Sequence, residues 1–203
     1  MKLYDAPRAA NPRRVRIFLA EKDVVIDTEP VDIMSKQHLE EPFARLNPLR
    51  RLPVLVLDDG TVITESIAIC RYFEEVHPDP PLFGRDPKEK ALVEMWQRRV
   101  EFGLLFPSQF AFRHTHPAMR ELEVPQIPEW GEANKPKIMS FLGFLDREMS
   151  ADGYVVGDAF SIADITALVA IDSLKLSKIR IPEDLTRLKS WYDRVSSRPC
   201  VVL

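Results

Sequence analysis

The first 76 residues alternate between short strand-like apolar runs and apolar stripes at helical spacing. Strands are predicted at 2–4, 27–32, 54–57 and 61–64, and Asp59-Gly60 supplies a tight turn between the last two. A helix is predicted to begin at Asn11-Pro12, with Asn11 as N-cap and Pro12 at the first helical position. A short helix is predicted over 36–46, and a third begins with Ser66 as its N-cap. The predicted order is β-α-β-α-β-β-α.

A proline-rich stretch ends this pattern, and the later segments show helical spacing only. A long helix is predicted from Asp86-Pro87, and Pro107 is expected to kink it or to end part of it. The segment 117–130 contains three prolines and is predicted to be a loop, followed by a helix over 137–149. The last helix is predicted to end before Arg198-Pro199.

The order of elements is typical of an α/β thioredoxin-like domain, in which helices flank a mixed sheet. We therefore predict this domain over residues 1–76, a linker over 77–85 and an all-α domain over 86–203. Inside the second domain, Ser161 and Asp164 have the spacing of a capping box, and Phe160 and Ile165 that of a hydrophobic staple. A buried helix is expected to begin there.

Composition narrows the class of protein. A 45% hydrophobic content supports a proper core, and a formal charge of −3 gives no basic footprint for nucleic acid. No apolar run approaches the length of a membrane span, and the first residues lack the apolar core of a signal peptide. The two cysteines, Cys70 and Cys200, lack metal-type spacing, so neither a metal site nor a disulfide is predicted. A cytoplasmic location is expected.

The hairpin carries the first functional signal. Pro53 has no N–H for a sheet, so it belongs at the first position of a strand; a cis Leu52-Pro53 bond would let Val54 present its main chain outward. A main-chain pair beside a sheet edge binds peptides by strand addition. Directly after the hairpin, Glu65-Ser66 opens a helix whose N-terminus attracts a carboxylate. One stretch therefore combines a peptide clamp with an anion pocket.

Together, Leu52-Pro53-Val54 and Glu65-Ser66 resemble the glutathione-binding domain of the cytosolic glutathione S-transferases, and the Ser161–Ile165 box extends the resemblance to the helical half. The resemblance implies conjugation of glutathione, as co-substrate, to a small apolar electrophile by a homodimer. It also implies that glutathione contacts Pro53, Val54, Glu65 and Ser66. By position, Arg51 and His38 match basic residues that meet the glycine carboxylate in this family.

Activation of the glutathione thiol departs from the usual pattern of the family. A free thiol has a pKa of about 8.5, so the site must favour the anion, most simply at the start of the first helix. The position that carries serine in theta-like members is Ala9 here. Tyr4 is predicted to be a sheet residue, and Asn11 remains as a thiol donor, a helix cap or both. The segment is similar to atypical fungal and bacterial members that lack the usual Tyr, Ser or Cys.

Further candidates follow from charge and from the resemblance. Arg8 and Arg13 bring positive charge near the thiol, with Arg8 placed toward the electrophile, although solvated surface arginines are the alternative. In some atypical members a water held by downstream polar side chains assists the thiol, and His114 is the candidate for that role here. Phe106 and Phe110 are predicted to line the electrophile pocket, with plain helix packing as the alternative.

Two other functions stay open from the sequence alone. Ala9 favours a non-catalytic glutathione-binding or scaffold protein, and glutathione-dependent reduction of a disulfide or peroxide is the second alternative. The loop 7–13 contains no cysteine, which argues against a mixed disulfide with the protein.

Overall fold

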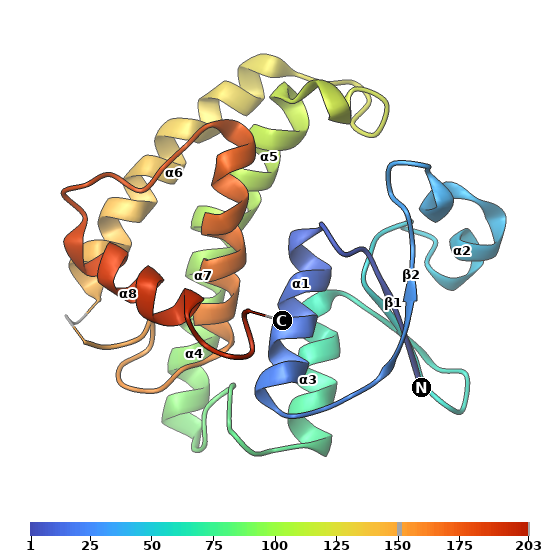
Figure 1. The fold of residues 1–203 in the computed structure, drawn as a ribbon, viewed down its shortest axis with the longest axis horizontal. Helices are drawn as coiled ribbons and strands as arrows, with labels where there is room; N and C mark the ends of the chain where they lie inside the picture. The colour runs from blue at the N-terminus through green and yellow to red at the C-terminus, as the bar shows by residue number, and fades with distance from the viewer. Residues whose placement is uncertain (150–151, 203) are drawn as a thin grey trace. The chain divides into compact units, whose positions relative to one another are not determined.

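A computed structural model describes residues 1–149 and 152–202. By its internal contacts the chain divides near Pro81 into two compact units, unit 1 over residues 1–81 and unit 2 over 82–202 (Figure 1).

Unit 1 is built on a four-stranded mixed sheet in the order β2-β1-β3-β4. The strands are β1 Lys2–Asp5, β2 Asp27–Pro30, β3 Val54–Val56 and β4 Val62–Thr64. β1 pairs parallel with β2 and antiparallel with β3, and β3 pairs antiparallel with β4 across the predicted turn. The predicted thioredoxin-like fold is confirmed.

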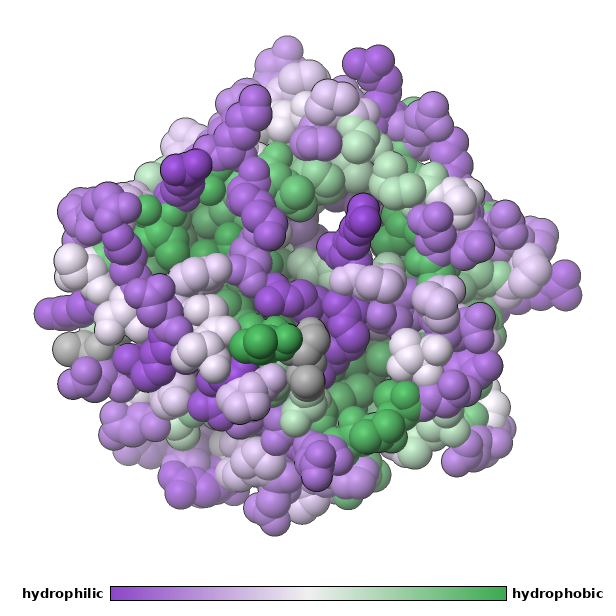
Figure 2. All heavy atoms as spheres, in the orientation of Figure 1, coloured by the Kyte–Doolittle hydropathy of each residue, from purple (hydrophilic) through white to green (hydrophobic). Residues whose placement is uncertain are grey.

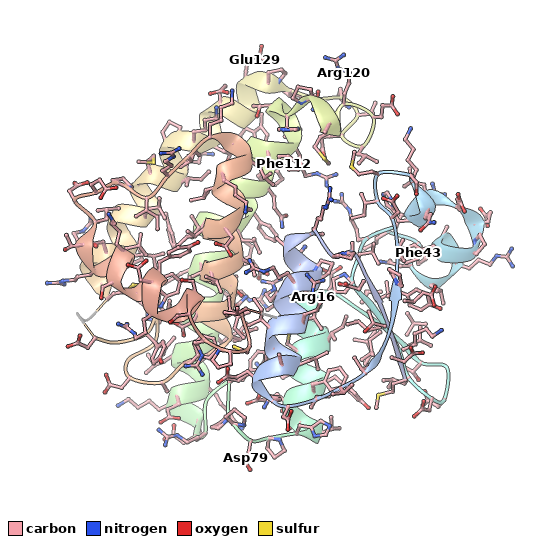
Figure 3. All side chains as sticks on the ribbon, in the orientation of Figure 1. Arg16, Phe43, Asp79, Phe112, Arg120 and Glu129 are labelled. Carbon is pink, nitrogen blue, oxygen red and sulfur yellow. The ribbon has the colours of Figure 1, made fainter. Side chains whose placement is uncertain are left out.

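Three α-helices accompany the sheet: α1 Ala10–Glu21, α2 Glu41–Leu46 and α3 Ser66–Val76. α1 and α3 pack against each other, and their apolar residues, including Phe18 and Phe73, are buried (Figure 1). Phe43 of α2, labelled in Figure 3, packs edge-on against Tyr4 of β1 with ring centroids 6.2 Å apart. Tyr4 is therefore a sheet residue, as predicted.

The starts of these helices correct the predictions from sequence. The N-cap of α1 is Ala9, so Asn11 lies inside the first turn and does not cap the helix. The N-cap of α3 is Glu65, and Ser66 is the first helical residue. The predicted helix over 36–46 is a 3-10 turn, Gln37–Leu39, followed by α2, because Glu40 is extended between them.

A buried lysine fastens the end of unit 1. The side chain of Lys22 is fully buried, and its Nζ pairs with a Glu74 carboxylate oxygen at 2.8 Å. The same Nζ donates to the carbonyl oxygens of His77 and Pro80 at 2.6 and 2.8 Å. Because an ammonium has three donors, these contacts satisfy it completely and hold the segment after α3 against α1.

Unit 2 is helical in the part of the chain that the structure describes. Its α-helices are α4 Pro87–Val100, α5 Phe106–Thr115, α6 Pro128–Glu148, α7 Ile162–Ser173 and α8 Thr186–Ser196. Short 3-10 turns span Pro117–Met119 and Leu174–Ser177. α5 and α6 run side by side (Figure 1). The predicted loop over 117–130 ends early, because α6 begins at Pro128 and Pro is well tolerated in a first helical turn.

Pro107 acts through the turn before it. The five residues Glu101–Leu105 form a π-helical turn between α4 and α5, and Pro107 lies in the first turn of α5. A proline has no N–H and its ring clashes with the carbonyl four residues earlier. The wider π turn accommodates this, so the helix changes its hydrogen bonding at the predicted place.

The predicted capping box is present and buried at the start of α7. One Asp164 carboxylate oxygen accepts from the N–H and the hydroxyl of Ser161, each at 3.0 Å. The other accepts from Val155 N–H and from Trp191 Nε1–H, each at 2.8 Å. Burial raises the pKa of Asp164, while these hydrogen bonds oppose the shift. One carboxylate thus ties α7 to α8 and to the preceding loop.

No helix among the described residues is long and apolar enough to cross a membrane. On the face shown in Figure 2, hydrophilic residues predominate and hydrophobic ones come to the surface in small groups.

Candidate functional site

The start of β3 has the predicted backbone geometry. The Leu52-Pro53 bond is cis, which confirms that prediction, and both Pro53 and Val54 are buried. Leu52 precedes the strand, and its side chain packs on an apolar cluster of Val31, Phe43 and Val54.

The position of Val54 in the sheet corrects its predicted role. β3 is a central strand, with Val54 opposite Tyr4 on one side and Thr64 on the other. Leu57 N–H bonds to Thr61 O at 2.9 Å, so by alternation Leu57 and Leu55 face β4, whereas Val54 faces Tyr4 of β1. The main chain of Val54 is therefore part of the sheet. Leu52 lies outside the strands, and its main chain takes no part in the strand pairing.

Ser66 lies at the start of α3 on a buried arginine. Its hydroxyl oxygen accepts from Arg14 Nη2 at 2.7 Å and from Arg14 Nε at 3.3 Å. Both residues are 3% exposed, and Arg14 comes from α1. This contact brings the N-terminal ends of α1 and α3 together, since Arg14 follows Asn11 by less than one turn. The two positive helix ends then share one locality.

Glu65 connects β4 to α3 in a strained conformation. Its φ of 65° and ψ of 117° lie outside the ordinary regions for a residue other than glycine, and the residue is exposed. Strain of this kind persists where the surrounding structure imposes it and is concentrated at functional sites. Because Val54 is opposite Thr64, Glu65 follows directly from the strand that borders β3. The cis-proline strand and the Glu65-Ser66 turn are thus neighbours, as the motif required.

The start of α1 offers main-chain donors but little side-chain chemistry. Ala9 is extended at the N-cap and carries only a methyl group. Pro12 has no N–H, so the amides that point out of the helix along its axis belong to Ala10 and Asn11. Arg16, labelled in Figure 3, holds the preceding loop: its Nη1 donates to both Asp5 carboxylate oxygens at 2.6 and 2.8 Å. Its Nη2 donates to Pro7 O at 2.8 Å. These contacts hold the loop in place. A hydrogen-bond donor to an anion at this position must come from the main chain at the start of α1 or from the Asn11 side chain.

The remaining basic candidates of unit 1 lie in different environments. His38 is 9% exposed within the 3-10 turn, Arg51 is exposed just before Leu52, and Arg13 is half-buried on α1. Arg8 is exposed on the loop before α1, and its charge is felt by Asp32.

In unit 2 the predicted pocket residues form an aromatic row. Phe102, Phe106 and Phe110 follow one another along the π turn and α5 with centroid distances of 5.7 and 6.4 Å. Phe110 also contacts Trp130 of α6 at 6.0 Å and His114 at 6.3 Å. Phe102 is 62% and Phe110 36% exposed. The row therefore presents aromatic surface and does not serve only as core.

His114 is held at the end of this row. Its Nδ1 accepts from Ile127 N–H at 3.1 Å, so in the neutral ring the proton is on Nε2. Nε2 lies 3.7 Å from a carboxylate oxygen of Glu123, which also pairs with Arg113. The imidazole is 8% exposed and has a defined tautomer, with its N–H directed toward Glu123. This arrangement can hold a water, and it also closes the loop between α5 and α6.

The cysteines contribute no reactive thiol. Cys70 is fully buried, and burial is the largest of the effects that raise its pKa to about 12. Cys200 is also buried, and neither cysteine forms a disulfide. At neutral pH the Cys70 thiol stays protonated and out of reach of a substrate.

Comparison with known proteins agrees with this geometry. The family profile "Glutathione S-transferase, N-terminal domain" matches residues 10–76, and "Glutathione S-transferase, C-terminal domain" matches residues 114–199. The chain is 35% identical over 204 residues to Glutathione S-transferase 2 of Saccharomyces cerevisiae, which covers 99% of this chain and 88% of that protein.

Solved structures give the same result. The crystal structure of Gtt2 from S. cerevisiae has a TM-score of 0.94 at 35% identity and covers 100% of this chain and 99% of that one. A glutathione S-transferase domain-containing protein from Marinobacter aquaeolei has a TM-score of 0.95 at 37% identity, covering 99% and 100%. A thioredoxin-like unit with this motif, followed by a helical unit, defines the class of glutathione-dependent transferases. The chain belongs to the glutathione S-transferase family.

Two residues of the candidate site were missed by reasoning from sequence. Arg14 had a usable signal, because it shares a helix face with the buried Phe18 four residues later, and a charge on an apolar face demands a partner. Leu52 had none, since the side of β3 that is free for a ligand depends on the strand register.

Proposed function

We propose that unit 1 binds glutathione at the paired N-terminal ends of α1 and α3, and that the enzyme joins glutathione, as its thiolate, to a small apolar electrophile through a new bond from the sulfur, with the proton of the thiol released and any leaving group departing from the electrophile. The observation that carries this proposal is the contact of Arg14 with Ser66, which places a buried positive charge and a helix N-terminus at the strained Glu65-Ser66 turn. Such a locality favours a carboxylate, and we assign it the γ-glutamyl carboxylate.

The peptide part of glutathione extends from this carboxylate along the start of β3. Leu52 supplies the main-chain N–H and C=O, with Pro53 fixing the entry of the strand. Arg51 and His38 meet the glycine carboxylate, and Arg13 adds positive charge. Glutathione is then held through its own two carboxylates and through one pair of main-chain hydrogen bonds, which fixes the position of its thiol.

The thiol lies at the start of α1, where the helix dipole favours the anion. At an exposed site this effect is worth about 0.3–1 kcal/mol, whereas each unit of pKa lowering needs about 1.4 kcal/mol. Ala9 adds no hydroxyl, so a second donor is required, and we assign Asn11 to that role. A water held by His114 Nε2 is the alternative donor. In this scheme the enzyme acts without the usual Tyr, Ser or Cys.

Phe106 and Phe110 are proposed to contact the electrophile, with Arg8 as a charged neighbour of the reacting groups. The exposed part of the aromatic row supports this, since stacking on an apolar ring suits an aryl or alkyl electrophile. A homodimer is proposed for the whole enzyme, and light scattering after size-exclusion chromatography would measure its mass.

One observation favours a second candidate function. Ala9 at the N-cap leaves the thiol without a hydroxyl partner, as in a protein that binds glutathione but does not activate it. A reductase that uses a protein thiol is less well supported, because burial keeps Cys70 protonated.

Substitution of Ser66 tests the binding site. We expect Ser66→Ala to weaken glutathione binding by about 1–3 kcal/mol, because a hydrogen bond to a charged group is lost. Isothermal titration calorimetry measures the affinity, and Ser35→Ala, an exposed serine of unit 1, is the matched control. Unchanged affinity in a folded Ser66→Ala protein would remove the carboxylate from this turn.

A further inference from the structure

The Ser66 hydroxyl accepts hydrogen bonds from Arg14, which leaves its O–H as a donor. A hydroxyl has two acceptor lone pairs and one O–H donor. Arg14 Nη2 and Nε, which lie on the same edge of the guanidinium, both donate to the Ser66 hydroxyl oxygen, at 2.7 and 3.3 Å. Both contacts use acceptor lone pairs of the oxygen, so the O–H is left to donate to a group other than Arg14.

We propose that Arg14 is a positioning residue that directs the Ser66 hydroxyl at the γ-glutamyl carboxylate of glutathione. This rests on the proposed function, in which Ser66 binds that carboxylate. Arg14 is charged at every relevant pH, and donation from a charged group polarises the O–H and strengthens it as a donor. The burial of both side chains keeps water from competing for the serine oxygen.

Arginine and lysine differ at this position in the number and geometry of their hydrogen-bond donors. Arg14→Lys keeps the charge but replaces two fixed, coplanar donors by a single flexible ammonium. The serine hydroxyl then regains freedom to rotate and to accept from other donors. The loss should appear in glutathione affinity and in KM for glutathione, with kcat nearly unchanged, because Arg14 does not touch the sulfur.

A double-mutant cycle tests the proposal by calorimetry with glutathione as the probe. We expect Arg14→Lys to weaken binding about tenfold when Ser66 is present, and less than about twofold when Ser66→Ala is already in place. A tripeptide analogue in which 4-aminobutyrate replaces the γ-glutamyl residue lacks the carboxylate, and Arg14→Lys should leave its affinity unchanged. Arg45→Lys is the matched control, because the Arg45 side chain is 79% exposed.

The outcomes distinguish this proposal from the one on which it rests. If Ser66→Ala weakens glutathione binding but Arg14→Lys does not, or costs the same with and without Ser66, Arg14 does not act through the hydroxyl. If Ser66→Ala itself binds glutathione like wild type, the assigned carboxylate site fails, and the role of Arg14 fails with it. Where Arg14→Lys does not fold, Arg14→Gln, which keeps one amide donor without charge, takes its place in the cycle.

Discussion

At the scale of residues, Asn11 is the side chain assigned to donate to the glutathione thiolate, because Ala9 at the N-cap has no polar group. Because Ala9 is the N-cap, Asn11→Ala removes no cap, so loss of a cap contributes nothing to the free energy of unfolding of this variant. If Asn11 donates to the thiolate, the same substitution should raise the pKa of the bound thiol by about one unit, since such a bond is worth roughly 1.5–3 kcal/mol. Titration of the bound thiol and chemical denaturation measure the two quantities separately.

A second variant at this position sharpens the test. Asn11→Asp keeps the size of the side chain but places a negative charge beside the thiolate, so it should fold well and transfer slowly. The measurement is the rate of conjugation of an activated aryl halide. If Asn11→Asp conjugates it as fast as wild type, Asn11 plays no part, and the water held by His114 becomes the remaining donor.

The conformation of a single residue was predictable where it depends only on its neighbours in the sequence. The cis bond at Pro53 followed from a proline that opens an apolar strand. The strain at Glu65 did not, because it arises where β4 meets α3 in three dimensions. The main-chain direction of Val54 was not predictable for a similar reason: it is set by pairing with Tyr4, which lies far away in the chain.

At the scale of elements, Asp164 makes α7 dependent on one carboxylate. Its two oxygens accept four hydrogen bonds from Val155, Ser161 and Trp191. Asp164→Asn keeps one acceptor and turns an NH₂ group toward the donors that bonded to the other oxygen. We expect the free energy of unfolding to fall by roughly 3–5 kcal/mol, since each lost charge-assisted bond is worth about 1.5–3 kcal/mol.

Denaturant unfolding checks this prediction, with Asp158→Asn as the control because Asp158 is exposed in the same loop. A stability for Asp164→Asn equal to that of the control would mean that the capping box does not support α7. The box itself was predictable from spacing alone, whereas the contact with Trp191 was not, because 27 residues separate the two side chains.

Errors in the elements have a common cause. The start of α6 was placed too late because three prolines in 117–130 were all treated as breakers, although Pro128 stands at a first helical position, where proline is favoured. The segment 36–46 was predicted as one helix, and Glu40 divides it. In both places the backbone conformation of one or two residues set the helix boundary, and the spacing of apolar residues does not predict that conformation.

At the scale of the whole molecule, the strand and helix order was sufficient to predict both the thioredoxin-like unit and the helical one. The sheet order β2-β1-β3-β4 brings the Pro53 strand next to the strand that leads into Glu65-Ser66. Two motifs separated in sequence thereby lie next to each other. The identity of the electrophile depends on the shape of a surface that no motif encodes.

The most direct test of the account is a titration of glutathione bound to the enzyme, followed by the ultraviolet absorbance of its thiolate. A free cysteine thiol ionises with a pKa of about 8.5, which serves as the reference for free glutathione. If the helix end and a second donor stabilise the anion, the midpoint for bound glutathione should lie about one to two pH units lower. Each unit corresponds to about 1.4 kcal/mol of extra stabilisation of the thiolate relative to the thiol. A midpoint unchanged from that of free glutathione, at full occupancy of the site, would contradict the proposed activation and favour a protein that only binds the tripeptide.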